Sequence, residues 1–327
     1  MTAWRMVVEA GRNAKTSLEI ARELLPWWSG YLVVDGKSVR VGKEEWSWFL
    51  GLDVGSRDLV QERLLESENR YDLLTYFRSL RDELRYRVKG VVSDLNPDIG
   101  WAIRQVWPVV PHQVCTTHML RWVDHLLDYR AVLKRLKRRE EKVEELLERL
   151  SRRPGPGRSS LLAELRDAKA RLVLAARQAR PTLWLRGKIE EFLLAKSRQH
   201  ALALYEQIGR RRWRYRGAGA KKALHSLEIH KEQLLTHFDH PKLPRNTNLL
   251  ENVIRNFERR LKTIESFRRK ETAEGYLRLM AIQYRCTPFT DCRGSHRAKN
   301  GKTPLALAHA TVSKDWVSFS QSKKDPP

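Results

Sequence analysis

Short apolar stretches separated by glycines and polar turns occupy the first third of the chain, and this pattern predicts strands. We expect three short strands between Gly30 and about Asp58, from YLVVDGKSVRV, a turn at Gly42-Lys43, and WSWFLGLDV. An amphipathic helix over 71–85, a buried strand in VKGVVSD, a helix over 99–106 and a strand in PHQVC should follow. A strand meander followed by helix-strand alternation predicts an α/β domain with a mixed sheet.

After His118 the pattern changes, because about 120 residues carry almost only helix signals. Leu136, Val143 and Leu150 recur seven residues apart with charges between them, which is typical of a long solvated helix or a coiled-coil arm. The segment PGPG at 154–157 is expected to break this helix before further helices follow.

The same patterns divide the chain into segments. We expect an N-terminal helical lead-in (1–29), the first part of the α/β domain (30–125), an all-helical insertion (126–240), the last part of the α/β domain with a long amphipathic helix (241–292), and a basic, irregular C-terminal tail (293–327) with a short helix at TPLALAHA. The α/β domain is therefore predicted to be interrupted by the insertion.

The chain is strongly basic, with 63 Lys and Arg residues against 39 Asp and Glu residues, a formal charge of +24 and a pI near 10.3. This charge predicts a polyanionic partner, nucleic acid first and an anionic membrane as the rival. No stretch approaches the roughly 18 apolar residues of a spanning helix, and the N-terminus lacks the pattern of a signal peptide. Three cysteines fit a reducing compartment. We expect a cytoplasmic or nucleoid-associated protein with no membrane partner.

Two aspartates are expected at the ends of apolar strands. Asp35 follows VV directly before Gly36, and Asp94 closes VVSD 59 residues later. Carboxylates at strand ends stand on a rigid rim and suit divalent metal ions, which prefer oxygen ligands. Each Asp could instead start a turn or cap a helix. Two such positions with a helix between them favour a metal site.

Glu251 offers a third carboxylate near the start of the amphipathic helix in TNLLENVIRNFERRLKTIESF. With Asn248 as N-cap it would be the third helical residue and could complete a capping box instead. Glu258 and Glu265 follow at intervals of seven, about 10.5 Å apart along a helix, so one metal pair cannot use two of them. The helix also carries cations that could hold phosphates or form a solvated face: Arg255, Arg259, Arg260 and Lys262.

The order and spacing of these motifs resembles the Mutator-like transposases and their bacterial insertion-sequence relatives. The similarity runs from roughly Gly30 to Pro304 and rests on VVDGK, VVSD, HQVCTTH, TNLLENVIRNFERRLKTIESF and GKTPLALA. It implies a ribonuclease H-like α/β fold with an all-helical insertion. It also implies a DDE active site, and the residues that match are Asp35, Asp94 and Glu251 as catalytic metal ligands, with Cys115 and His118 as the flanking Cys-x-x-His element. About thirty residues precede the first predicted strand, too few for a separate domain that recognises element ends.

The Cys-x-x-His spacing of Cys115 and His118 also occurs in zinc sites. A structural zinc ion normally has four ligands, and the other cysteines lie far along the chain in CTPFTDC, so we expect no zinc site. Two interpretations stay open. The thiol and imidazole could orient the active site or a DNA strand, or they could serve packing alone.

The run RRRWRYR at 210–216 interleaves cations with aromatic rings. That combination binds a nucleic-acid backbone while stacking on exposed bases. An ordinary solvated turn is the alternative. If the run binds DNA, the contacts come from Arg210, Arg211, Arg212, Trp213 and Arg214.

Together the motifs and the resemblance predict a transposase that cleaves DNA and transfers the strands of a mobile element. Two Mg²⁺ or Mn²⁺ ions, about 3.5–4 Å apart, would flank the scissile phosphate. The expected partners are the element ends, the target DNA and further copies of the chain assembled on DNA. A hydrolytic nuclease of the same fold, and a non-catalytic DNA-binding protein derived from a transposase, are the alternatives.

Overall fold

The computed structural model describes residues 3–152, 157–215, 217–312 and 315–321. The chain forms two compact units, the first from Met1–Cys115 and Asp239–Pro327 and the second from Thr116–Phe238. The second unit begins at 116 rather than at the predicted boundary of 126, because helix α5 (Thr116–Leu126) packs on the two helices that follow it. Of the predicted break at 154–157, residues 154–156 lie outside the described residues, and Gly157 is the N-cap of α7.

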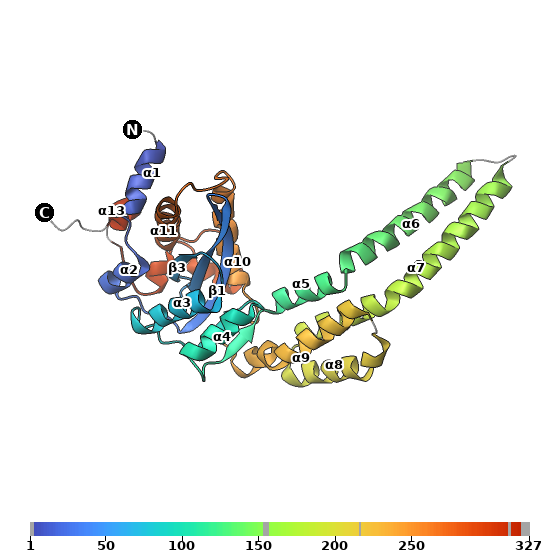
Figure 1. Cartoon of the computed structure of the whole chain (residues 1–327), viewed down its shortest axis with the longest axis horizontal. Coiled ribbons are helices and arrows are strands. Elements are labelled where there is room, and N and C mark those ends of the chain that lie inside the picture. Colours follow the sequence, from blue (N-terminus) through green and yellow to red (C-terminus); the bar gives the residue numbers. More distant parts are fainter. Residues whose placement is uncertain (1–2, 153–156, 216, 313–314, 322–327) are drawn as a thin grey trace. The chain divides into compact units, whose positions relative to one another are not determined.

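A five-stranded sheet with the order β3-β2-β1-β4-β5 lies at the centre of the first unit (Figure 1). Its strands are β1 (Tyr31–Val41), β2 (Glu44–Asp53), β3 (Leu59–Leu65), β4 (Gly90–Ser93) and β5 (His112–Val114). The pairs β1–β2 and β2–β3 are antiparallel, whereas β4 is parallel to both β1 and β5. The prediction of an α/β domain with a mixed sheet is confirmed.

The strands differ from the sequence prediction in two respects. Only β1 and β2 lie in the stretch expected to hold three strands, and the third strand begins after Asp58. The expectation that Asp35 ends a strand is also wrong, because β1 continues through it to Val41 and pairs Asp35 with Leu50. Pairing with the long strand β2 keeps β1 extended beyond the point where β4 stops.

Helices cover both faces of this sheet. On one face α3 (Arg70–Asp82) and α4 (Pro97–Val106) pack on Leu32 and Val34, and on the other α10 (Asn248–Leu261) and α11 (Lys270–Cys286) pack on Val33 and Val92. The remaining elements of the unit are α1 (Ala3–Arg12), α2 (Ser17–Leu24), the 3-10 segment Gly294–Lys299, α12 (Pro304–Leu307) and α13 (Trp316–Ser320). The tail is thus less irregular than predicted, because Leu305 and Phe319 are buried beside Ile20.

A buried polar network joins the ends of β2 and β3 to α11. Asp58 accepts two hydrogen bonds of 2.8 Å from the guanidinium of Arg285 and one of 3.0 Å from the indole of Trp28. Nearby, Asp53 accepts the hydroxyl proton of Tyr86 at 2.7 Å. Asp58 is 0% exposed and Arg285 is 1% exposed, so this ion pair belongs to the core.

The second unit is helical throughout its described residues. Besides α5 it contains α6 (Tyr129–Arg152), α7 (Arg158–Leu193), α8 (Arg198–Arg210), the 3-10 segment Arg212–Arg214 and α9 (Ala218–Asp239). Figure 1 shows α6 and α7 side by side as an antiparallel hairpin. Val143, Leu146 and Leu150 of α6 pack against Leu161 and Leu165 of α7.

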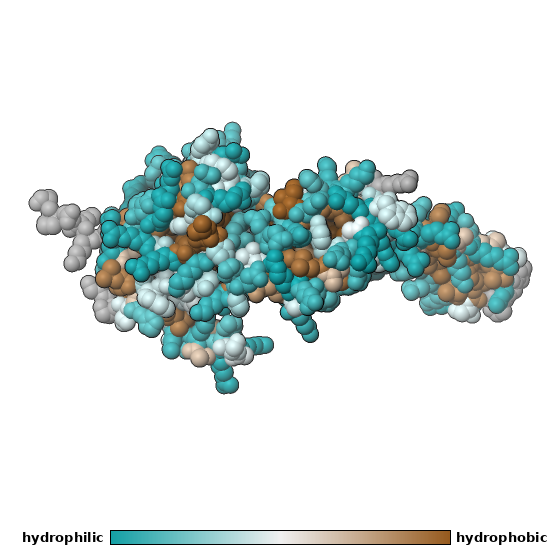
Figure 2. Space-filling model, turned by 90° about the horizontal axis from the view of Figure 1, so that it is seen from below, coloured by the Kyte–Doolittle hydropathy of each residue, from teal (hydrophilic) through white to brown (hydrophobic). Residues whose placement is uncertain are grey.

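Hydrophilic residues cover most of the surface seen in Figure 2, and apolar residues form separate patches on it. None of the described helices combines the length and the apolar composition needed to cross a bilayer.

Candidate active site

Asp35 lies within β1, and Asp94 belongs to the segment after the neighbouring parallel strand β4. Val33 of β1 lies opposite Val92 of β4, and each aspartate follows its valine by two residues. The paired register ends at these valines, so both aspartates lie just beyond the last pair of the two strands. Asp94 directly follows β4, as predicted, and its carboxylate accepts a hydrogen bond from the backbone N–H of Asn96 at 3.0 Å.

Asp35 lies on the sheet face that α10 covers. Side chains two residues apart on a strand point to the same face. Val33 packs in the core that includes Leu250 of α10, so Asp35 in the same strand is directed to that side. Asp35 is buried, at 9% exposure, and Asp94 is half-buried.

Glu251 lies in the first turn of α10, and the predicted capping box does not form. The N-cap is Thr247 rather than Asn248, and Thr247 makes no capping hydrogen bond with its side chain. Glu251 is therefore the fourth helical residue, one position too far along for a capping box. Its carboxylate instead accepts the hydroxyl proton of Thr247 at 3.3 Å.

Cys115 connects the strand end that carries Asp94 to the start of α10. Its backbone N–H donates to the carbonyl of Ser93 at 2.8 Å, and its Sγ accepts the backbone N–H of Thr247 at 3.4 Å. The Sγ atom lies within 4.8 Å of a carboxylate oxygen of Glu251. These contacts bring Glu251 to the rim where Asp94 lies. His118 is the third residue of α5, in the second unit.

Glu68 is a further carboxylate near this rim, and sequence reasoning missed it. Its Oε1 accepts the hydroxyl proton of Ser47 at 2.6 Å and lies over Gly36, where a Cβ atom would be only 1.9 Å away. Its Oε2 is 3.4 Å from the amide nitrogen of Asn96. The one signal was the glycine within a strand, which often marks a close approach by another group.

Glu258 has a different environment from Glu251, although both lie on α10. Its carboxylate forms an ion pair of 2.5 Å with Lys37 of β1. The hydrogen bond from Lys37 lowers the pKa of Glu258 below its ordinary value. The four cations predicted to hold phosphates are exposed at or just past this helix, and Arg259 also donates to Asn256 at 2.7 Å.

The predicted basic-aromatic run lies between α8 and α9 and contacts its own unit. Arg211 stacks over Trp184 at 4.5 Å, Arg212 pairs with Glu228 at 3.1 Å, and Arg214 lies over Trp213 at 4.9 Å. Arg210 is 3.6 Å from Glu206. Trp213 is 68% exposed, and Arg216 lies outside the described residues. Acidic and aromatic neighbours thus already engage much of this run.

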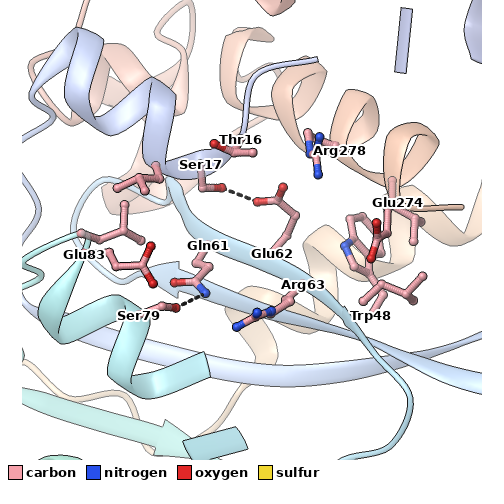
Figure 3. Close-up of a pocket in the computed structure, with 14 residues that line it drawn as sticks. Thr16, Ser17, Trp48, Gln61, Glu62, Arg63, Ser79, Glu83, Glu274 and Arg278 are labelled. Atoms are coloured by element: carbon pink, nitrogen blue, oxygen red, sulfur yellow. Dashed lines mark hydrogen bonds between the residues drawn. The ribbon is translucent and has the colours of Figure 1, made fainter. Parts of the chain in front are cut away.

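A polar cavity of about 240 Å³ opens beside β3, at the opposite edge of the sheet from β5 (Figure 3). Glu62 faces this cavity and accepts a hydrogen bond from the hydroxyl of Ser17, and Arg278 of α11 points toward it. Burial raises the pKa of Glu62, while the hydrogen bond from Ser17 acts in the other direction. The cavity is therefore separate from the aspartates of β1 and β4.

Replacing Glu62 by glutamine is expected to raise the melting temperature by a few degrees near neutral pH and by less near pH 4. Because the folded-state pKa is raised, the folded protein keeps this proton to a higher pH than the unfolded chain. The free energy of unfolding therefore falls as the pH rises from the pKa of Glu62 in the unfolded chain to its pKa in the folded protein. Glutamine still accepts the Ser17 hydrogen bond but carries no charge. Thermal unfolding of both proteins at the two pH values measures this, and an equal difference at both would contradict it.

Comparison of the chain with protein-family models and with curated proteins finds no match. The chemistry of the site residues therefore carries the functional proposal. One aspartate within β1, a second directly after the neighbouring strand β4 and a glutamate in the first turn of α10 are hard oxygen donors, which Mg²⁺ and Mn²⁺ prefer.

Proposed function

We propose that this protein is a DDE transposase, a metal-dependent enzyme that cleaves DNA and transfers the strands of a mobile element. The main support is the parallel pairing of β1, which contains Asp35, with β4, which Asp94 directly follows, together with the packing of the Glu251 helix on β1. The sheet order, the helices on both faces and the interruption by a helical unit support the ribonuclease H-like form of the α/β fold. The resemblance of the motif order to DDE transposases agrees with this.

Each site residue has a role in this proposal. Asp35 and Asp94 would hold divalent ions from the rigid sheet, and Glu251 would add its carboxylate from α10. When bound, a pair of Mg²⁺ or Mn²⁺ ions would activate water or a DNA 3′-hydroxyl and stabilise the leaving oxygen. Thr247 and Cys115 would position Glu251, because Thr247 contacts both the carboxylate and the thiol.

The proposal makes DNA the partner, both as element ends and as target, with several copies of the chain assembled on it in the cytoplasm or nucleoid. The formal charge of +24 supports a polyanionic partner. The exposed cations lie on or just past α10, the helix that carries Glu251. They would therefore contact the phosphates next to the cleaved bond.

The test incubates the full chain with duplex DNA carrying the sequences that flank its gene, in Mg²⁺ or Mn²⁺. Nicked and joined products are expected with the wild-type chain and none in excess chelator. Asp35→Asn and Asp94→Asn should each lower the cleavage rate by more than about 100-fold. Mutating a residue that only hydrogen-bonds to a metal ligand already lowers metal affinity or activity about 10–100-fold. Both variants should keep their affinity for DNA, measured in chelator, because only metal ligands change.

Three outcomes would overturn the proposal. Products that are cut but never joined would indicate a hydrolytic nuclease. Binding without cleavage in either metal would indicate a non-catalytic DNA-binding protein. Normal cleavage by either Asp variant would remove that residue from the site.

A further inference from the structure

The first turns of α6 and the middle of α7 carry cations and no acidic residue. From 130 to 139 α6 contains six cations, namely Arg130, Lys134, Arg135, Lys137, Arg138 and Arg139, and from 168 to 180 α7 contains four, namely Lys169, Arg171, Arg177 and Arg180. We call these ten residues the basic block. All ten side chains are exposed.

The two halves of the basic block lie side by side. Arg135 lines one small cavity together with Gln178 of α7, and Arg139 lines another together with Arg171. Along α6, residues 134, 135, 138 and 139 share one side of the helix and line a common groove. Cations of α6 therefore lie next to one another along the helix, and Arg139 lies close to Arg171 of α7.

Most of the basic block is not neutralised within the protein. Among the residues that the structure describes, only Lys137 and Arg171 of the ten form ion pairs, at 3.8 Å with Glu141 and 2.8 Å with Asp167. The distal half of α6 differs, since its cations alternate with glutamates. There Lys142 and Arg149 pair with Glu145, and Arg152 pairs with Glu148. The other eight positive charges of the basic block have no ion pair among the described residues, and holding them close together costs repulsion, which a polyanion would relieve.

We propose that the basic block binds the phosphate backbone of duplex DNA. Single-stranded nucleic acid is usually held by stacking on exposed aromatic rings, and neither 130–139 nor 168–180 contains an aromatic residue. Residues 130–139 span about 13.5 Å of helix, and duplex DNA carries one charge per about 1.7 Å. Several phosphates therefore lie within reach of this surface at once.

This inference deepens the DNA partner of the proposed function but does not depend on catalysis. It also adds a surface to the two predicted DNA contacts, 210–214 and the cations of α10, and in the first of these Arg211 and Arg212 already have partners. Leu133, Val173 and Leu174 are exposed apolar residues on the same two helices. A basic surface with exposed apolar residues can also bind an anionic membrane, so the test must distinguish DNA from lipid.

The experiment measures the affinity of the full chain for a random duplex of about 30 base pairs, in chelator, over a range of KCl concentrations. The variant Arg135→Ala/Arg138→Ala/Arg139→Ala should flatten the slope of log affinity against log salt by about 2.7, at about 0.9 per phosphate contact. The control Arg149→Ala/Arg152→Ala removes two charges from the same helix, at positions that are paired with glutamates and do not line the groove. Its slope should stay close to that of the wild-type chain.

Circular dichroism checks that the helices remain, and glutamine at 135, 138 and 139 provides a second variant with a good helix former. An unchanged slope, or an equal loss per removed charge in the control, would overturn the inference. So would tighter binding to single strands, or to vesicles with anionic lipid, than to the duplex. The variant Asp35→Asn should show the same salt slope as the wild-type chain. The binding experiment therefore tests the basic block whether or not the protein cleaves DNA.

Discussion

Glu251→Gln is expected to abolish DNA cleavage, whereas Glu258→Gln is expected to leave it nearly unchanged. The Glu251 carboxylate lies beside Cys115 and Thr247, whose contacts lead to the strand end at Asp94. Glu258 is seven residues further along α10, about 10.5 Å away, and is paired with Lys37. Since one metal pair cannot use both, removing the Glu251 charge should cost more than about 100-fold in cleavage rate.

The two variants control for each other, because each replaces one charged group of α10 by a neutral amide of similar size. A glutamine at 251 still accepts the Thr247 hydroxyl proton, so its melting temperature should stay close to that of the wild-type chain. Glu258→Gln loses a partly exposed ion pair, which usually contributes no more than about 1 kcal/mol. Single-turnover cleavage and thermal unfolding of both variants measure these effects. An active Glu251→Gln together with an inactive Glu258→Gln would show that the triad is assigned wrongly.

Arg285→Met is expected to destabilise the first unit by about 3–5 kcal/mol, because it leaves Asp58 as a buried charge without its cation. Asp58 and Arg285 are almost completely buried and are joined by two hydrogen bonds. The remaining hydrogen bond from Trp28 does not supply a positive charge. Urea unfolding, followed by tryptophan fluorescence, measures the change in the free energy of unfolding.

The double variant Arg285→Met/Asp58→Asn provides the control, since it removes both charges and should recover part of the lost stability. The exposed pair of Arg81 and Asp82 offers a second control. Arg81→Met should have little effect, because solvent screens that pair. A double variant less stable than Arg285→Met alone would mean that Asp58 is held by its other hydrogen bonds rather than by the arginine.

Local pattern was a good guide to most elements of the first unit and a poor guide to their lengths. The apolar runs around Val33 and Val92 predicted strands, because β-branched residues between turn residues favour extended backbone. The strand LVQERLL was missed, since its polar centre interrupts the apolar run. It forms as the edge strand beside β2, with Leu59 and Leu64 packed in the core. The length of β1 likewise follows from its pairing with β2.

The candidate site also combines a feature that the sequence predicted with features that only the folded structure decides. The position of Asp94 directly after an apolar strand is a local feature, and the sequence alone was enough to predict it. The neighbourhood of Asp35 and Asp94 depends on the parallel register of β1 and β4, and Glu68 reaches Gly36 only when the sheet is formed. The link from Cys115 to Thr247 joins residues 132 positions apart. Short-range periodicity carries no information about such contacts, because they arise from strand register and from helix packing across an inserted unit.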